Sequence, residues 1–396
     1  MKRVYITTLV TVALVLLCFG VGYSLRERRA DMSAIKVGFI YDSDESTPYT
    51  YNFTLAQSAL ERELQGSVKV YSRSNVPDDE TLEPIQELVR AGCQIIFTNN
   101  YSPQVVEAAR EYPEIQFCQS SFSSANHDDY PANYHTFNDE IYQARYVSGV
   151  AAGLKLREML DRSSLRPEEA LVGYVGAFPS VEVVSGYTAF LLGVRSVAPE
   201  AVMRVRYTGT WSNYTREKQC AKALIDEGCV VICQHTDTVG PAMACEEAKA
   251  GRQIIHVGYN QSMTDIAPGT SLISVNVNWS PYVVGAVKAV MAREGIEKSV
   301  PGSANGNDLS GGFDQGWVQV LDLNLQIAAY GTEEKLGKVV DGLKNGSIEV
   351  FKGDYVGVDI DDPTQTIDLS QGFKENDGHS WPSFHYLLKD VITVEE

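Results

Sequence analysis

The chain has 396 residues, too many for one small hydrophobic core, so two domains are the default expectation. Its composition is that of an ordinary folded protein, with 44% hydrophobic and 21% charged residues. The formal net charge of −18 would repel a phosphate backbone, which argues against nucleic-acid binding.

The N-terminal segment predicts attachment to a membrane. An uncharged run from residue 4 to residue 25 follows Lys2 and Arg3, and a basic cluster follows the run. As a helix this run would span about 33 Å, enough to cross the apolar core of a bilayer. We expect residues 1–33 to form an uncleaved anchor; a cleaved signal segment or a lipid on Cys18 are the alternatives. The remaining chain would then lie on the extracytoplasmic face of a bacterial cell membrane.

Strand and helix patterns alternate from residue 35 onward. Apolar, β-branched runs separated by helical stripes of ten to fifteen residues predict βαβ units and a parallel sheet. The first series comprises a strand at 35–42, a helix at 49–65, a strand at 68–73, a helix at 81–92, a strand at 93–100, a helix at 102–113 and a strand at 114–121.

A long helix pattern at 139–160 separates this series from a second one. The second series comprises strands at 171–178, 201–211, 229–237 and 253–260, with helices at 180–199, 216–228 and 239–251 between them. We therefore expect two α/β lobes in tandem. The expected division is 34–139 for the first lobe, 140–274 for the second, and 275–396 for a return to the first lobe and C-terminal segments packing on both.

The loops after the strands predict a binding site, because ligands of open parallel sheets lie beyond the carboxyl ends of the strands. Nearly every such loop here pairs an aromatic ring with an Asn, Asp or Gln. Rings stack on flat ligand faces, and amides and carboxylates match the edge of a heterocycle. The candidate ligand-binding residues are Tyr49, Asn100, Tyr101, Phe178, Trp211, Asp237, Asn260, Asn278 and Trp279.

Sequence signatures of catalysis and of cofactor binding are missing. The chain has no G-x-S-x-G, H-E-x-x-H, Walker A or G-x-G-x-x-G pattern. Its histidines show no metal-ligand spacing with its cysteines, and no C-x-x-C occurs. We therefore expect no catalytic residue, metal or cofactor. The six cysteines after the N-terminal segment are expected to be free buried thiols, with disulfides as the alternative.

Four stretches carry a family resemblance: "VGYVGAFPSVEVVSGYTAFLLGVRSVAPEA", "AKALIDEGCVVICQHTD", "VGYNQSMTDIAPGTSLISVNVNWSPYVVGAVKAV" and "LKNGSIEVFKG". Through them the chain, over residues 35–396, resembles the basic-membrane-protein (PnrA-like) family of ABC transporter substrate-binding proteins, and within it a purine-binding branch. The resemblance implies an α/β, type I periplasmic-binding fold: two doubly wound, Rossmann-like lobes joined by a three-strand hinge, with the ligand in the cleft between them.

The resemblance also implies roles for single residues. Tyr49 and Phe178 fall on stacking positions of the family, which predicts that the two rings sandwich a planar ligand. The other positions that match the family's site are Asp237, Asn260, Asn278 and Trp279. We expect Asp237 and Asn278 to read the ligand's hydrogen-bonding edge. The alternative for Asp237 is a cap on the helix that begins near residue 239.

The predicted function is that of a monomeric solute-binding protein that delivers a purine base or nucleoside to an ABC permease. A membrane-tethered sensor of the same fold, signalling through a partner protein, is the alternative. A nucleoside hydrolase would need a metal-binding cluster of carboxylates, for which Asp42 and Asp44 are the only local candidates.

Overall fold

A computed structural model describes residues 34–121 and 123–395 of the protein. The predicted membrane segment, residues 1–33, lies outside these residues, and so does Cys18. Within the described ranges, no helix combines the length and the apolar character that crossing a bilayer requires. The six cysteines of these ranges are free, and five of them are buried.

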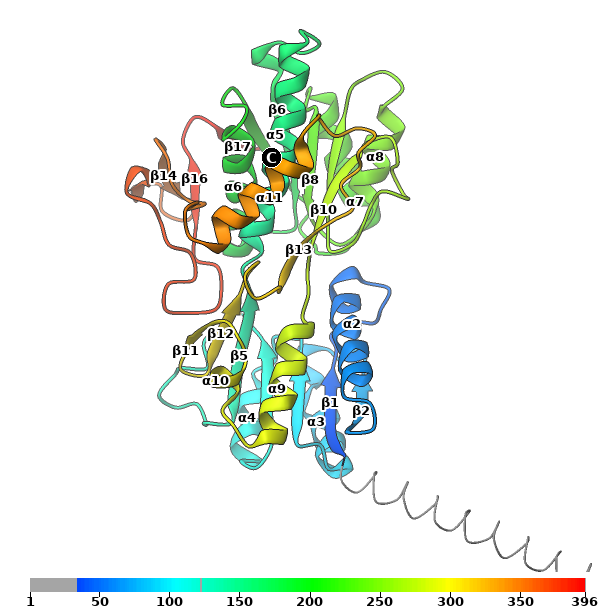
Figure 1. Cartoon of the computed structure of the whole chain (residues 1–396), viewed down its shortest axis with the longest axis vertical. Coiled ribbons are helices and arrows are strands. Elements are labelled where there is room, and N and C mark those ends of the chain that lie inside the picture. The colour runs from blue at the N-terminus through cyan, green and yellow to red at the C-terminus, as the bar shows by residue number, and fades with distance from the viewer. Residues whose placement is uncertain (1–33, 122, 396) are drawn as a thin grey trace, which may run out of the picture.

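The first lobe is a seven-stranded sheet with helices packed on its faces (Figure 1). Its strands run parallel except at one edge, where β11 is antiparallel to β12. In spatial order the strands are β11 (Ser303–Asn305), β12 (Asp308–Gly311), β5 (Tyr134–Asp139), β4 (Gln116–Ser120), β3 (Ile95–Thr98), β1 (Ile35–Ile40) and β2 (Val68–Arg73). Its helices are α2 (Pro48–Glu63), the short η1 (Asp78–Glu80), α3 (Leu82–Ala91), α4 (Gln104–Glu111), α9 (Ser280–Ala292) and α10 (Ile296–Ser299).

The second lobe has the same plan, with one antiparallel edge strand, β13, beside β10. Its strands in spatial order are β13 (Val318–Leu321), β10 (Ser271–Val277), β9 (Ile255–Tyr259), β8 (Val231–His235), β6 (Leu171–Gly176), β7 (Val202–Tyr207) and β17 (Ile392–Val394). Its helices are α5 (Ile141–Asp161), η2 (Pro167–Glu169), α6 (Val181–Arg195), α7 (Tyr214–Asp226), α8 (Gly240–Ala248) and α11 (Thr332–Lys344).

The chain passes between the lobes three times: after β5, after β10 and after β12 (Figure 1). The predicted fold class, two doubly wound α/β lobes joined by three crossing segments, is confirmed. The second and third crossings are tied together at Asn278. Its backbone N–H donates to the carbonyl of Trp317 at 2.6 Å, and its side-chain amide donates to the carbonyl of Gly316 at 3.0 Å.

Helices α5 and α6 of the second lobe touch through glycines. A Cβ atom added to Gly149 would lie 2.1 Å from the carbonyl oxygen of Phe190, and one added to Gly193 would lie 2.1 Å from that of Tyr146. Because both obstacles are backbone, any larger residue would push the helices apart. This close contact fixes the position of α5 in the second lobe. The helix begins two residues after β5, so the second lobe starts directly after the first crossing.

The C-terminal segment adds a small antiparallel sheet beside the second lobe (Figure 1). Its elements are β14 (Val356–Asp359), β15 (Thr366–Asp368), η3 (Leu369–Gln371) and β16 (Tyr386–Leu388). The loop 372–385 contacts both lobes: Glu375 accepts a hydrogen bond from the Ser185 hydroxyl of α6 at 2.6 Å, and the backbone N–H of Ser380 donates to Asp308 of β12 at 2.8 Å. The division of the chain at residues 139 and 274 stays a prediction, although β10 keeps residues 275–277 in the second lobe's sheet.

Candidate functional site

A small cavity of about 90 Å³ lies between the two lobes. Its wall combines four aromatic rings, three carboxylates and one amide. The lining residues are Asp42, Tyr49 and Tyr101 from the first lobe and Glu182, Trp211, Asp237, Tyr259 and Asn260 from the second. Most of them stand at or just after the carboxyl end of a strand, where an open parallel sheet places its ligand.

The first lobe presents an oriented carboxylate, Asp42, which follows β1 by two residues. The Thr50 hydroxyl and the Asn99 amide both donate to its Oδ1 atom, at 2.8 Å and 3.1 Å. The cleft walls displace water around the carboxylate and raise its pKa, and these two hydrogen bonds offset part of that rise. These bonds fix the orientation of the carboxylate, which lines the cavity. Tyr49, in the first turn of α2, donates its hydroxyl to the Asn99 carbonyl at 3.2 Å.

The second lobe presents Asp237, which follows β8 and is 9% exposed. Its Oδ1 atom accepts from the Asn260 amide at 3.0 Å. Asn260 has a φ of +61°, in the left-handed region that asparagine tolerates better than most residues. It also accepts from the amide of Asn52, on α2 of the first lobe, through its backbone and side-chain oxygens at 3.2 Å each. One hydrogen-bonded chain therefore runs from the first lobe to the carboxylate of the second.

Negative charge exceeds positive charge in the cleft. Burial raises the pKa values of Glu182, Asp237 and Asp139 to about 7. Glu182 raises the pKa of Asp139 further, and Asp42 raises that of Asp237 across the cleft. The buried Arg145, whose guanidinium lies 4.0 Å from the centroid of the Tyr259 ring, lowers the pKa of Glu182 in part. A site with more acids than bases suits a ligand that carries N–H donors or positive charge.

A neutral histidine lies beneath the acidic wall. His235 is fully buried, and its Nε2 atom lies 3.4 Å from Glu182, while its Nδ1 atom lies 3.2 Å from the Tyr174 hydroxyl. Burial lowers the pKa of His235 well below its usual value, so the imidazole is uncharged at neutral pH. It can orient Glu182 and Tyr174 by hydrogen bonds without neutralising the carboxylate.

The structure brings five of the predicted residues into the cavity wall: Tyr49, Tyr101, Trp211, Asp237 and Asn260. Their role in binding stays a prediction. Phe178 is not among the lining residues. Its ring packs edge-on against Trp211 with the centroids 5.9 Å apart, and the residue is 37% exposed. Trp211 and Tyr259 supply the aromatic surface of this lobe that lines the cavity, and the stacking role of Phe178 stays a prediction.

Three predicted residues make contacts within the protein and are not among the residues that line the cavity. Asn100 is buried, and its amide donates to the Thr81 hydroxyl at 2.7 Å. Asn278 uses its amide on Gly316 and its Oδ1 atom on the backbone N–H of Ser280 at 3.2 Å. Trp279 is 1% exposed and stacks on Phe53 with the ring centroids 4.8 Å apart. These three residues are not among those that line the cavity, and their contact with ligand stays a prediction.

Sequence reasoning left four residues of the cleft out of the candidate set: Asp42, Asn52, Glu182 and Tyr259. Asp42 and Tyr259 stand in strand-end loops that the pattern had marked, so the same rule could have included them. Glu182 lies in the first turn of α6, where an acidic residue is common for helix stability alone. Asn52 lies inside α2 and gives no sequence signal, because its partner is 208 residues away.

The fold is that of an α/β protein with a small cavity between its two lobes. The family model of PnrA-like ABC transporter substrate-binding proteins matches residues 31–338. The chain belongs to this family, whose members are solute-binding proteins, and substrate-binding proteins of ABC importers work outside the cytoplasm.

Similar proteins are known among characterised sequences and solved structures. The chain is 31% identical to a purine-binding protein of Brucella abortus over 262 residues, which cover 65% of this chain and 69% of that one. It is 26% identical to a putative ABC transporter glucose-binding protein of Haloferax volcanii over 300 residues, 75% of this chain and 69% of that one. In fold it is similar to an ABC transporter solute-binding protein from Aeropyrum pernix, with a TM-score of 0.63, 16% identity, and coverage of 79% of this chain and 92% of that one. These likenesses bear out the type I periplasmic-binding fold.

Proposed function

We propose that this protein captures a purine base or nucleoside outside the cytoplasmic membrane and presents it to an ABC permease. The observation that carries the proposal is the cavity between the lobes, where aromatic rings and carboxylates line one small space. The membrane attachment through residues 1–33 and the monomeric state are part of the same proposal.

The chemistry of the lining supports a flat, N–H-bearing ligand. Tyr49 and Tyr101 stand on one side, and Trp211 and Tyr259 stand on the other. A base stacked on an aromatic ring gains about 1–3 kcal/mol per ring, so two rings would supply about 2–6 kcal/mol of the roughly 8 kcal/mol that micromolar binding requires, and hydrogen bonds would supply the rest. The carboxylates accept hydrogen bonds but donate none when ionised, which matches ring N–H and exocyclic amine groups. The similarity to the Brucella purine-binding protein points the same way, whereas the Haloferax relative makes glucose the ligand to test against it.

Binding by hinge closure follows from the division of the site. Each lobe supplies one wall, so a ligand gains its full set of contacts only when the three crossing segments let the walls meet. The hydrogen bonds between Asn52 and Asn260 also join the two lobes, directly and without a ligand. Ligand is held and released without chemical change.

A matched pair of tryptophan variants tests the proposal. Isothermal titration calorimetry would compare purine bases, nucleosides and glucose on the wild type, on Trp211→Ala and on Trp381→Ala. Both tryptophans are partly buried, but Trp381 stacks on His379 in the C-terminal loop, outside the cavity. We expect a purine to bind the wild type and the Trp381 variant alike, and the Trp211 variant about 5- to 150-fold more weakly. Binding of glucose without binding of any purine would overturn the proposed ligand class.

A further inference from the structure

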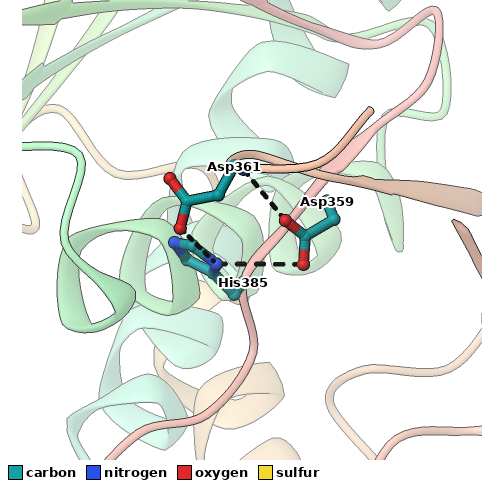
Figure 2. Close-up of side chains that lie close together, drawn as sticks. All are labelled: Asp359, Asp361 and His385. Carbon is teal, nitrogen blue, oxygen red and sulfur yellow. Dashed lines mark hydrogen bonds and ion pairs between the residues drawn. The ribbon is translucent and has the colours of Figure 1, made fainter. Parts of the chain in front are cut away.

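Two carboxylates and an imidazole meet in the C-terminal sheet, away from the cleft (Figure 2). Asp359 ends β14, Asp361 lies in the turn after it, and His385 directly precedes β16, the strand that pairs with β14. One ligand atom of each lies within 4.8 Å of the others. The cluster also lies beyond residue 338, where the match to the family ends.

The separations suit ligands of one ion better than hydrogen-bond partners. The Nδ1 atom of His385 lies 3.9 Å from Oδ2 of Asp359 and 3.6 Å from Oδ2 of Asp361. Both distances exceed the roughly 2.7–3.2 Å of a hydrogen bond. Around a tetrahedral ion with bonds of about 2.0–2.2 Å, neighbouring ligand atoms stand about 3.3–3.6 Å apart. The ligand atoms of the two carboxylates lie within 4.8 Å of each other, so side-chain movements of up to about an ångström would bring all three onto such an ion.

The backbone holds the first ligand in place. The N–H groups of Asp361 and Asp362 both donate to Oδ1 of Asp359 at 2.9 Å, which leaves Oδ2 on the side of His385 (Figure 2). The side chains of Asp359 and His385 are 17% and 18% exposed, whereas that of Asp361 is 83% exposed. Two covered ligands and one exposed ligand leave an open approach for an ion and for a water molecule in the fourth position.

The charge of the two carboxylates also favours a bound cation. Two carboxylates this close repel each other, and a divalent cation between them neutralises both. A mixed imidazole and carboxylate set favours Zn²⁺ or a similar transition metal over Ca²⁺ and Mg²⁺, which take oxygen ligands. The geometry points to a binding site for a divalent transition-metal ion, with Zn²⁺ as its best match, formed by Asp359, Asp361 and His385.

The ion would act as a structural clip. It would join the turn after β14 to the end of the loop 372–385, next to Phe384, whose ring stacks on Phe351 at 4.3 Å. That loop contacts Ser185 of the second lobe and Asp308 of the first. The ion would therefore fasten one end of the segment that spans both lobes.

Calorimetric titration of Zn²⁺ into the full-length, tag-free protein in detergent with a phosphine reductant tests the site. Asp361→Asn removes an exposed ligand with little risk to the fold, and Asp362→Asn is its matched control, because the Asp362 carboxylate is engaged by Thr364 and Gln365. A second control, His127→Ala, removes an exposed histidine that faces one carboxylate, Asp129, at 3.9 Å.

We expect one Zn²⁺ site in the wild type and both controls, and binding at least tenfold weaker in Asp361→Asn. Zn²⁺ should also raise the melting temperature of the wild type but not that of Asp361→Asn. A wild type that binds no Zn²⁺, or an Asp361→Asn variant that binds it as tightly as the wild type, would overturn the assignment. Binding of Ca²⁺ in place of Zn²⁺ would show that the imidazole is not a ligand, and would overturn it as well.

Discussion

Replacing Asp237 with asparagine is expected to stabilise the empty protein while changing its choice of ligand. Burial raises the pKa of Asp237 from 3.8 to about 7, with further contributions from the nearby carboxylates of Glu217, Glu182 and Asp42. The folded protein therefore binds this proton more tightly than the unfolded chain. Stability falls as pH rises from about 4 to 7, and the full cost of the charge is present above pH 7.

The size of the effect follows from the shift. About three pKa units at roughly 1.4 kcal/mol each set an upper bound on the order of 4 kcal/mol, which coupling among the carboxylates will reduce. Asparagine has nearly the same shape, and its oxygen can still accept from Asn260. We expect the Asp237→Asn variant to gain about 1–3 kcal/mol in free energy of unfolding at pH 8 and much less at pH 5.

Denaturant unfolding at both pH values, with Asp44→Asn as the control, measures this effect. Asp44 is a carboxylate whose pKa is lowered by hydrogen bonds from Ser46 and Asn75, so its replacement should not stabilise the protein at pH 8. Calorimetry with a panel of purines would show whether the ranking of ligands changes. Lower stability at pH 8 with an unchanged ranking would refute the reasoning and favour a helix-capping role. In the structure the N-cap residue of α8 is Val239, and the first N–H of the helix, that of Gly240, donates to the Thr238 hydroxyl at 3.1 Å.

Three further predictions concern the same cleft. Asn52→Ala removes the hydrogen bonds to Asn260, which contribute about 0.5–1.5 kcal/mol, so purine affinity should fall about 2- to 12-fold. Small-angle scattering should show a more open molecule, and unchanged scattering would contradict this. Raising the pH from 6 to 8 should strengthen purine binding, because Glu182 and Asp237 have pKa values of about 7 and accept N–H groups when ionised. Fewer protons should be released on binding at pH 8, since these carboxyl groups have already lost them, and an affinity independent of pH would argue against direct contact. Trp279→Phe should lower the free energy of unfolding by about 0.5–3 kcal/mol and leave the affinity of the folded protein unchanged, since this ring is buried in the core. A loss of affinity without a loss of stability would show that Trp279 contacts the ligand.

The lobes could be predicted from the sequence because their signals are local. A buried parallel strand such as residues 95–98 is apolar throughout, and an amphipathic helix such as α3 repeats its apolar residues at a helical period. The strand-end rule then placed Tyr49, Trp211 and Asp237 at the cleft, because that rule follows from the topology alone.

The remaining features depend on which distant residues meet. Asn278 and Trp279 have the polar and aromatic character of ligand-binding residues, but the third crossing segment and Phe53 occupy them first. The cluster of Asp359, Asp361 and His385 forms only because β14 pairs with β16 across a gap of more than twenty residues. No local pattern reports such a pairing.

The placement of the carboxylates suggests why closure should depend on ligand. Asp42 belongs to the first lobe, whereas Glu182 and Asp237 belong to the second, and the charge of Asp42 already raises the pKa of Asp237. Closing an empty cleft would bring like charges together in a space with little water, which opposes closure at pH values above about 7. A ligand that offers N–H donors to both walls removes this repulsion and adds stacking. We therefore expect the same acids that select the ligand to keep the empty protein open.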